Sequence, residues 1–193
     1  MNEFPPGFTL RRATPADLVP FGEFSRRTFR ATYGPFQTPE RMARHLDERM
    51  NDRLLAKELA DPARTVLVLT HDGDWAGYAQ LRGGDSPPGL SAVRPVEIER
   101  FYVAHAWHGR GLAAPLMATT LDAAREMGHD VAWLAVWEEN PRAVRFYEKQ
   151  GFRIAGRHIY LFAGTPEDDH LMVMELQGRH GPPERTDGVQ RTA

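Results

Sequence analysis

The sequence predicts one mixed α/β domain built around a single central sheet, and three observations support this fold class. The chain has 193 residues, which is enough for one domain with a substantial core. Apolar residues make up 41% of it, as in ordinary globular proteins. Strand and helix patterns follow one another in the order β-α-α-β-β-β-α-β-α-β-β, which differs from a regular βαβ alternation.

The N-terminal part has the pattern of a short strand followed by two helices. Residues 7–13 are expected to form the strand. A Thr-Pro pair at 14–15 is a helix start signal, and Gly34 ends this first helix. A polar helical region follows from residue 38 to about residue 60, and we expect a break in it near Asn51.

The remaining segments alternate between strand and helix patterns. An Asp-Gly turn at 72–73 predicts a hairpin. Residues 131–137 are almost entirely apolar, as in a strand that is covered on both faces. The expected strands are 64–70, 75–82, 96–103, 131–137, 152–162 and 170–176, and the expected helices are 111–128 and 140–151.

The ends of the chain are expected to lie outside this domain. Residues 178–193 contain almost nothing to bury, so we expect a disordered C-terminal tail. Residues 1–7 are expected to be a flexible N-terminus. The predicted organisation is therefore one domain over residues 8–177 with a flexible segment at each end.

The net charge and the absence of cysteine exclude several classes of protein. The formal net charge is −2, so a nucleic-acid-binding protein is not expected. There is no cysteine, which excludes disulfides, thiolate metal sites and a cysteinyl-enzyme intermediate. The sequence has no run of about 18 apolar residues, so no membrane span is expected. The N-terminus lacks the pattern of a signal peptide, and we expect a cytoplasmic protein.

A glycine loop joins the strand at 96–103 to the helix that follows it. Gly109 and Gly111 lie in this loop, and a glycine-rich turn that opens a helix often presents its N–H groups to an anion. A nucleotide-binding P-loop would need a lysine that the loop lacks. A dinucleotide fingerprint, G-x-G-x-x-A, fits residues 109–114, but that motif normally opens a series of βαβ units. A plain strand-to-helix turn would also favour glycine.

A second motif follows one apolar strand later and decides between these readings. Residues 108–113, His-Gly-Arg-Gly-Leu-Ala, resemble the Q/R-x-x-G-x-G/A loop of the GCN5-related N-acetyltransferases (GNAT), with His108 in place of Gln or Arg. The second motif of that family, N-x-x-A-x-x-F-Y-E-x-x-G-F, is matched by Asn140, Ala143, Phe146, Tyr147, Glu148, Gly151 and Phe152. The resemblance covers residues 8–177. More narrowly, the chain resembles bacterial PaiA-type polyamine N-acetyltransferases.

This resemblance implies a fold, a reaction and a cofactor. The fold would be a single GNAT-like domain with a mostly antiparallel sheet flanked by helices. The reaction would be direct transfer of an acetyl group from acetyl-CoA to a primary amine in a ternary complex, with no metal. The partner would be a small-molecule amine, best a polyamine such as spermidine or spermine, and a homodimer is common in such folds.

The resemblance also implies roles for individual residues. Tyr147 matches the general acid that protonates the departing thiolate. Glu99 is the expected base for the amine and Glu97 the alternative, since the family places a carboxylate on this strand. The residues expected to bind the coenzyme are Tyr102, Val103, His108, Gly109, Arg110, Gly111, Leu112, Ala113 and Asn140.

Simpler structural roles remain open for several of these residues. Glu97 and Glu99 would lie on one face of an extended strand, unless a bulge separates them, and either could be part of a surface salt bridge. Asn140 could act only as a helix N-cap, and Tyr147 could be a core residue. His105 and His108 are three residues apart, but no third ligand accompanies them, so no metal site is expected.

Two alternatives to this function also remain. The acceptor could be an amino acid, a peptide N-terminus or an aminoglycoside. The chain could instead be an acyl-CoA-binding regulator that has kept the loop and lost the chemistry.

Overall fold

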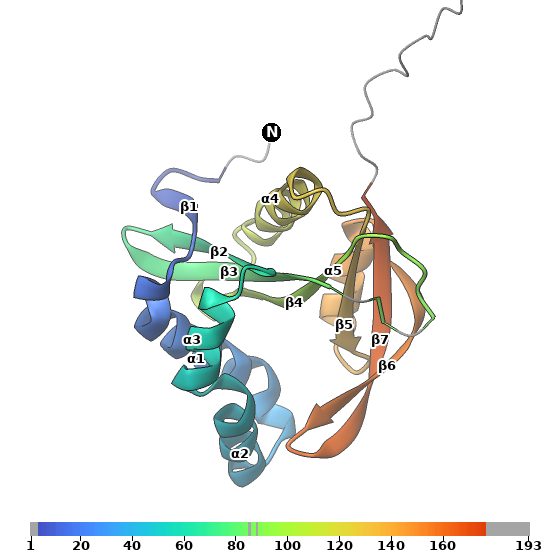
Figure 1. Ribbon diagram of the computed structural model, residues 1–193. Coiled ribbons are helices and arrows are strands. Elements are labelled where there is room, and N and C mark those ends of the chain that lie inside the picture. Colours follow the sequence, from blue (N-terminus) through green and yellow to red (C-terminus); the bar gives the residue numbers. More distant parts are fainter. Residues whose placement is uncertain (1–3, 85, 88, 177–193) are drawn as a thin grey trace, which may run out of the picture.

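The computed structural model describes residues 4–84, 86–87 and 89–176, and Figure 1 shows one twisted sheet with helices on both faces. The sheet has seven strands in the order β1-β2-β3-β4-β5-β7-β6. Every neighbouring pair is antiparallel except β4 and β5. The predicted fold class is therefore confirmed. The tail expected at 178–193 lies outside the described residues.

The elements have the following bounds. The strands are β1 Phe8–Arg12, β2 Arg64–His71, β3 Asp74–Gly83, β4 Pro95–Val103, β5 Val131–Trp137, β6 Arg153–Phe162 and β7 Thr165–Glu175. The helices are α1 Leu18–Tyr33, α2 Pro39–Met50, α3 Asp52–Ala60, α4 Ala113–Glu126 and α5 Pro141–Lys149. Short 3₁₀ turns lie at Pro15–Asp17, Gly34–Phe36 and His105–Trp107.

The polar region after α1 contains two helices, where the predicted element order counted one. The expected break is at Asn51, whose backbone is extended, with φ −72° and ψ 156°. Its side chain accepts a hydrogen bond of 3.0 Å from the Leu54 amide and so caps α3. The capping side chain therefore ends one helix and starts the next.

The last strand begins five residues earlier than predicted. Ala163 and Gly164 both have positive φ, 47° and 77°, and form a two-residue turn between Phe162 and Thr165, which pair in the ladder. The next residues, Pro-Glu-Asp-Asp, have the composition of a loop, yet they continue the hairpin with β6. This extension places acidic side chains on the sheet.

The helices divide into two layers around the sheet (Figure 1). On one face, α1 and α3 pack through Phe21, Phe24 and Leu55 against β2 and β3. On the other face, α4 and α5 pack through residues such as Met117 and Val144 against the centre of the sheet. The sheet is therefore buried on both sides.

Strands β4 and β5 pair over only part of their length. The parallel ladder joins residues 95–97 to residues 131–133. Beyond Glu97, the register pairs β4 with β3 alone, while β5 continues beside β7. The two central strands therefore diverge, and one edge of the second half of β4 is left without a strand neighbour.

Candidate active site

A β-bulge in β4 decides which of its side chains face the α1–α3 side of the sheet. The register pairs Leu81 with Ile98 and then Gln80 with Arg100, so Glu99 is the extra residue. Ile98 packs in the core beneath α4 and α5. Because of the extra residue, Glu99 and Arg100 both reach the opposite face.

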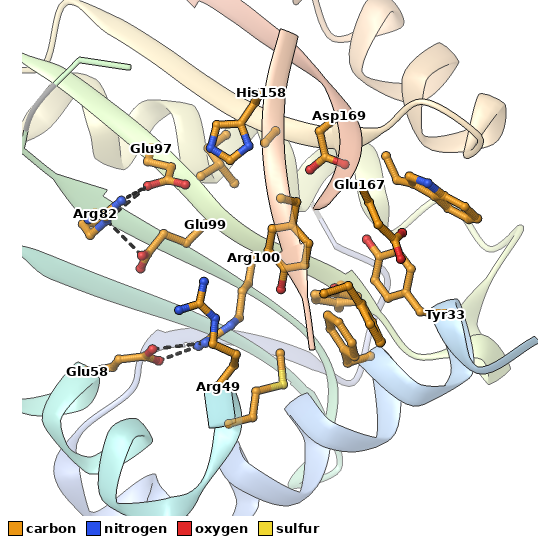
Figure 2. A pocket seen from close by; sticks show the side chains of 18 of the residues that line it. Tyr33, Arg49, Glu58, Arg82, Glu97, Glu99, Arg100, His158, Glu167 and Asp169 are labelled. Atoms are coloured by element: carbon orange, nitrogen blue, oxygen red, sulfur yellow. Dashed lines mark hydrogen bonds and ion pairs between the residues drawn. The ribbon is translucent and has the colours of Figure 1, made fainter. Parts of the chain in front are cut away.

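A cavity of about 610 Å³ lies on that face, where β4 and β5 diverge. Its walls come from α1, α2, α3 and the strands β2 to β7. Figure 2 shows its polar side chains converging from these elements. Its lining includes six carboxylates and four arginines, namely Glu48, Glu58, Glu97, Glu99, Glu167, Asp169, Arg49, Arg64, Arg82 and Arg100.

The Glu99 carboxylate is fully occupied by donors. Arg64 Nε lies 3.0 Å from Glu99 Oε2, and Arg82 Nε lies 2.9 Å from Glu99 Oε1. Gln80 adds a hydrogen bond of 2.9 Å to Oε2. Nearby, Arg100 pairs with Glu58. Glu99 is thus the centre of an ion-pair network and has little room for a substrate proton.

Glu97 is less engaged. Arg82 contacts only its Oε2, and the described residues provide no hydrogen-bond partner for Oε1. Burial raises the pKa of Glu97, and the hydrogen bond from Arg82 opposes that rise. Of the two glutamates that the sequence singled out, Glu97 has the freer carboxylate.

Asp169 is a site residue that the sequence analysis missed. It lies on β7, is 6% exposed and lines the cavity. In the part of the chain that the structure describes, no hydrogen bond or ion pair engages its carboxylate. Burial raises its pKa to about 7, and the charges of Glu167, Asp168 and Glu138 add to the rise. Beginning the predicted strand at residue 170 left Asp169 out of it, although the alternation of Asp169 with Leu171 and Val173 was a usable signal.

The main chain of β4 shows which groups face the gap toward β5. The Ala104 amide donates to the Ala76 carbonyl of the β3 side at 2.8 Å. Since main-chain groups alternate along a strand, Tyr102 also points toward β3, whereas Phe101 and Val103 point toward the gap. The main-chain N–H and C=O of Tyr102 therefore belong to the β3–β4 pairing and are not open to the gap. The Tyr102 side chain lines the cavity instead.

The glycine loop leads directly into the N-terminus of α4. Gly109 and Gly111 both have φ of 76°, a conformation that favours glycine. Among the described residues, no acceptor is paired with the amides of Gly111, Leu112 and Ala113. Unpaired N–H groups at the start of a helix, together with the helix dipole, are the features that attract an anion. The Arg110 guanidinium lies over the Trp107 ring, 5.0 Å from its centroid.

Asn140 directly precedes α5 and Tyr147 lies within it, and this helix packs beneath the same gap. Asn140 Oδ1 accepts from the Ala143 amide at 3.1 Å, so Asn140 is the N-cap of α5. The Tyr147 ring packs edge-on against Phe101 and Phe152, and burial raises its pKa. Asn140 therefore acts as the N-cap of α5, as one reading of the sequence expected. Tyr147 lies next to the part of β4 that faces the gap.

The described residues contain no group of three or more His, Asp or Glu side chains placed to hold a metal ion. The rings of His105 and His108 are 5.1 Å apart, but no further ligand joins them. Within the same described ranges, no helix is long and apolar enough to cross a membrane.

The diverging strands, the open glycine loop and the adjoining polar cavity define a class of protein. They are the features expected of an acyltransferase domain. The family model described as Acetyltransferase (GNAT) family matches residues 26–152. The chain belongs to this family.

Relatives and solved structures agree with this assignment. An uncharacterised N-acetyltransferase of Mycobacterium bovis is 38% identical over 150 residues, which are 78% of this chain and 92% of the relative. The PaiA N-acetyltransferase of Thermoplasma acidophilum in complex with coenzyme A has a similar fold, with a TM-score of 0.68 and 17% identity over 87% of this chain and 98% of that one. The NAA60 protein of Arabidopsis thaliana in complex with acetyl-CoA gives a TM-score of 0.65 and 16% identity over 87% and 98%. The chain is an acetyl-CoA-dependent N-acetyltransferase of the GNAT type.

Proposed function

We propose that this enzyme acetylates a primary amine of a small molecule by direct transfer, with the amine bound in the cavity and acetyl-CoA in the gap between β4 and β5. The observation that carries the proposal is the junction of the two sites. Two of the cavity carboxylates, Glu97 and Glu99, lie on the same diverging strand as the main-chain edge of Phe101 and Val103. An amine held in the cavity would thus meet the thioester without a covalent enzyme intermediate.

On this proposal, the coenzyme contacts divide between main chain and side chains. The amides of residues 111–113 would hold the pyrophosphate, and the outward main chain of Phe101 and the Val103 N–H would pair with the pantetheine arm, since the Val103 carbonyl already accepts from His108. Asn140 would contribute its Nδ2 group, which its capping role leaves free. Tyr147 would protonate the leaving thiolate, since its hydroxyl proton is retained at neutral pH.

A polyamine is the first candidate for the acceptor. The cavity lining contains six carboxylates against four arginines, and an acidic cavity attracts a polycation. Five of these carboxylates, Glu48, Glu58, Glu97, Glu99 and Glu167, already contact arginines. The net attraction for a second ammonium group would therefore come mainly from Asp169.

A second candidate is an amine that also carries a carboxylate or carbonyl group, and the contacts of Tyr160 favour it. His45 Nδ1 accepts from the Ala163 amide at 3.2 Å, so the neutral ring donates from Nε2 to the Tyr160 hydroxyl at 2.9 Å. Tyr160 then keeps its own proton for a further acceptor. Arg49 lies beside it in the cavity lining. Together they would bind an anionic or carbonyl oxygen.

The test is release of free thiol from acetyl-CoA with a panel of amines. Spermidine and spermine represent polyamines, and free amino acids and short peptides represent the second candidate. Saturable turnover with any of them supports the proposed reaction, and the preferred amine decides between the candidates. Binding of acetyl-CoA without turnover of any amine, at protein concentrations up to those of the coenzyme, would contradict the proposal and favour an acyl-CoA-binding regulator.

A further inference from the structure

Asp169 differs from the other carboxylates of the cavity in having no cation beside it. Glu97 and Glu99 both contact Arg82, and Glu167 contacts Arg41 at 3.4 Å. Asp169 is more deeply buried than any of these, yet no such contact exists for it within the described residues. A buried carboxylate without a partner is costly unless a ligand supplies one.

The surroundings of Asp169 do not supply that partner. In the β6–β7 ladder it lies opposite His158, but no hydrogen bond or ion pair joins the two, and burial lowers the pKa of His158 so that the ring stays neutral. His158 Nδ1 is itself buried without a hydrogen-bond partner among the described residues. Figure 2 shows His158, Asp169 and Glu167 side by side along the cavity.

Asp169 also lies near the expected general acid. Burial raises the pKa of Tyr33 on α1, and the charges of Tyr147 and Asp169 raise it further. Tyr33 is therefore within electrostatic range of both residues, and it lines the cavity. Tyr147 packs against Phe101 on the α5 side of the sheet, whereas Asp169 lines the cavity on the opposite side.

We propose that Asp169 binds the ammonium of the acceptor and removes its proton before attack. The inference rests on the proposed function, which it deepens by naming the amine-binding base. An N–H bond breaks, its proton forms an O–H bond with Asp169, and the electron pair stays on nitrogen. The nitrogen then bonds to the thioester carbonyl carbon, and the C–S bond breaks with its pair going to sulfur. Tyr147 gives its proton to sulfur, and the second nitrogen proton restores the Tyr147 hydroxyl.

The charges around Asp169 match this role. The groups that face it are Glu167 and Asp168 on β7, Glu138 after β5, His158 and Tyr160 on β6, and Tyr33 on α1. The charged residues that share its cavity on other elements are Glu48 and Arg49 on α2, Glu58 on α3, Arg64 on β2, Arg82 on β3, and Glu97, Glu99 and Arg100 on β4. Burial and like charges raise the pKa of Asp169 to about 7. A base is most effective when its pKa is near the working pH.

The test compares Asp169→Asn with Asp168→Asn. Asp168 is the same residue type on the same strand, but it is exposed and absent from the cavity lining. With the best amine of the panel, Asp169→Asn should lower kcat/KM by on the order of 100-fold or more and abolish the acidic limb of its pH profile near pH 7. Asp168→Asn should stay within about twofold. The affinity for acetyl-CoA should be unchanged in both variants.

A second variant separates chemistry from packing. Asp169→Ala should be inactive, and added formate should restore part of its turnover in proportion to the formate concentration, which a merely structural role would not allow. The wild type could turn over an amine while Asp169→Asn is equally active and keeps the acidic limb of its pH profile. That result would overturn the assignment of Asp169 as the base and leave the proposed function standing. A wild-type protein inactive on the whole panel would overturn the proposed function and this inference with it.

Discussion

The His108 ring is bound to the Val103 carbonyl, with 2.9 Å between Nε2 and the carbonyl oxygen. Because a carbonyl only accepts hydrogen bonds, Nε2 must carry the proton. The contact joins the glycine loop to the end of β4 across the 3₁₀ turn His105–Trp107. It therefore ties the loop that holds the amides of residues 111–113 to the outward edge of β4, and it gives this histidine a structural role in that connection.

Replacing His108 with Ala should mainly affect the coenzyme. Loss of one hydrogen bond costs about 1 kcal/mol, so we expect the Kd for acetyl-CoA to rise by roughly fivefold with little change in kcat. Calorimetric titration with coenzyme A and steady-state kinetics measure the two effects. His108→Gln, which can still donate to the carbonyl, is the matched control and should recover most of the affinity. A fall in kcat with unchanged Kd would assign His108 to the chemistry instead.

Gly111→Ala should weaken coenzyme binding through the backbone. A Cβ at this position meets no atom within 4 Å, so the cost comes from the positive φ of 76°, about 1–2 kcal/mol for an alanine. The loop can relieve that strain by reorienting the amides, and affinity for coenzyme A should then fall by about tenfold or more.

Gly73→Ala is the matched control for the glycine loop. Gly73 also has a positive φ, 92°, and also has open space around it, but it lies in the β2–β3 turn. Both substitutions introduce the same kind of backbone strain, so Gly73→Ala and Gly111→Ala should lower the melting temperature by similar amounts. Gly73→Ala should leave the affinity for the coenzyme unchanged. Equal effects of the two variants on affinity would show that the loop amides do not bind the coenzyme.

Tyr147→Phe tests the general acid. The ring contacts with Phe101 and Phe152 should survive the substitution, so the melting temperature and the Kd for acetyl-CoA should change little. Turnover should fall by on the order of 100-fold, because only the proton for the leaving thiolate is lost. Single-turnover measurements at saturating amine would detect this. Normal turnover would make Tyr147 a core residue.

The sequence was sufficient for the fold because its signals are local or periodic. The Asp-Gly turn, the N-caps and the apolar strand at 131–137 each specify an element through backbone preference or burial. The break at Asn51 is of the same kind. The divergence of β4 from β5 is not visible in the sequence. It depends on which strands pair with each other in the folded sheet, and no local or periodic pattern specifies that.

The chemistry of the carboxylates could not be predicted in this way. Glu99 was expected to be a base, and it lies on the expected strand, but its contacts with Arg64, Arg82 and Gln80 come from the separate strands β2 and β3. Asp169 was missed because it is the last residue of a loop-like acidic segment, Pro-Glu-Asp-Asp. The state of a carboxylate depends on its neighbours in space, which no spacing rule supplies.

Glu99→Gln should therefore act on stability and position more than on proton transfer. Replacing the carboxylate leaves Arg64 and Arg82 with one fewer anionic partner, and we expect a loss of roughly 1–3 kcal/mol in the free energy of unfolding. Any fall in turnover should be the same at all pH values. Urea denaturation and a pH–rate profile test both points. A rate loss that shrinks as the pH rises would restore Glu99 as the base.

His45 should make the stability of the protein depend on pH. It is fully buried and stacked on Phe162, with ring centroids 4.3 Å apart, and burial lowers its pKa from 6.5 to about 4. Above pH 6.5 the ring is neutral in both the folded and the unfolded chain. Between pH 6.5 and 4 only the unfolded chain takes up the proton. The free energy of unfolding therefore decreases as the pH is lowered through this range, by up to roughly 3 kcal/mol.

The matched variant for this prediction is His45→Gln, whose amide can accept from Ala163 and donate to Tyr160 without titrating. Asp169 changes stability in the opposite sense over part of the same range, because its raised pKa favours the folded state at low pH. Since Asp169 is present in both proteins, the difference between their unfolding free energies isolates His45. We expect this difference to favour the wild type more at pH 7 than at pH 4.5. A difference that does not vary with pH would mean that His45 is not held neutral by its stacked and hydrogen-bonded surroundings.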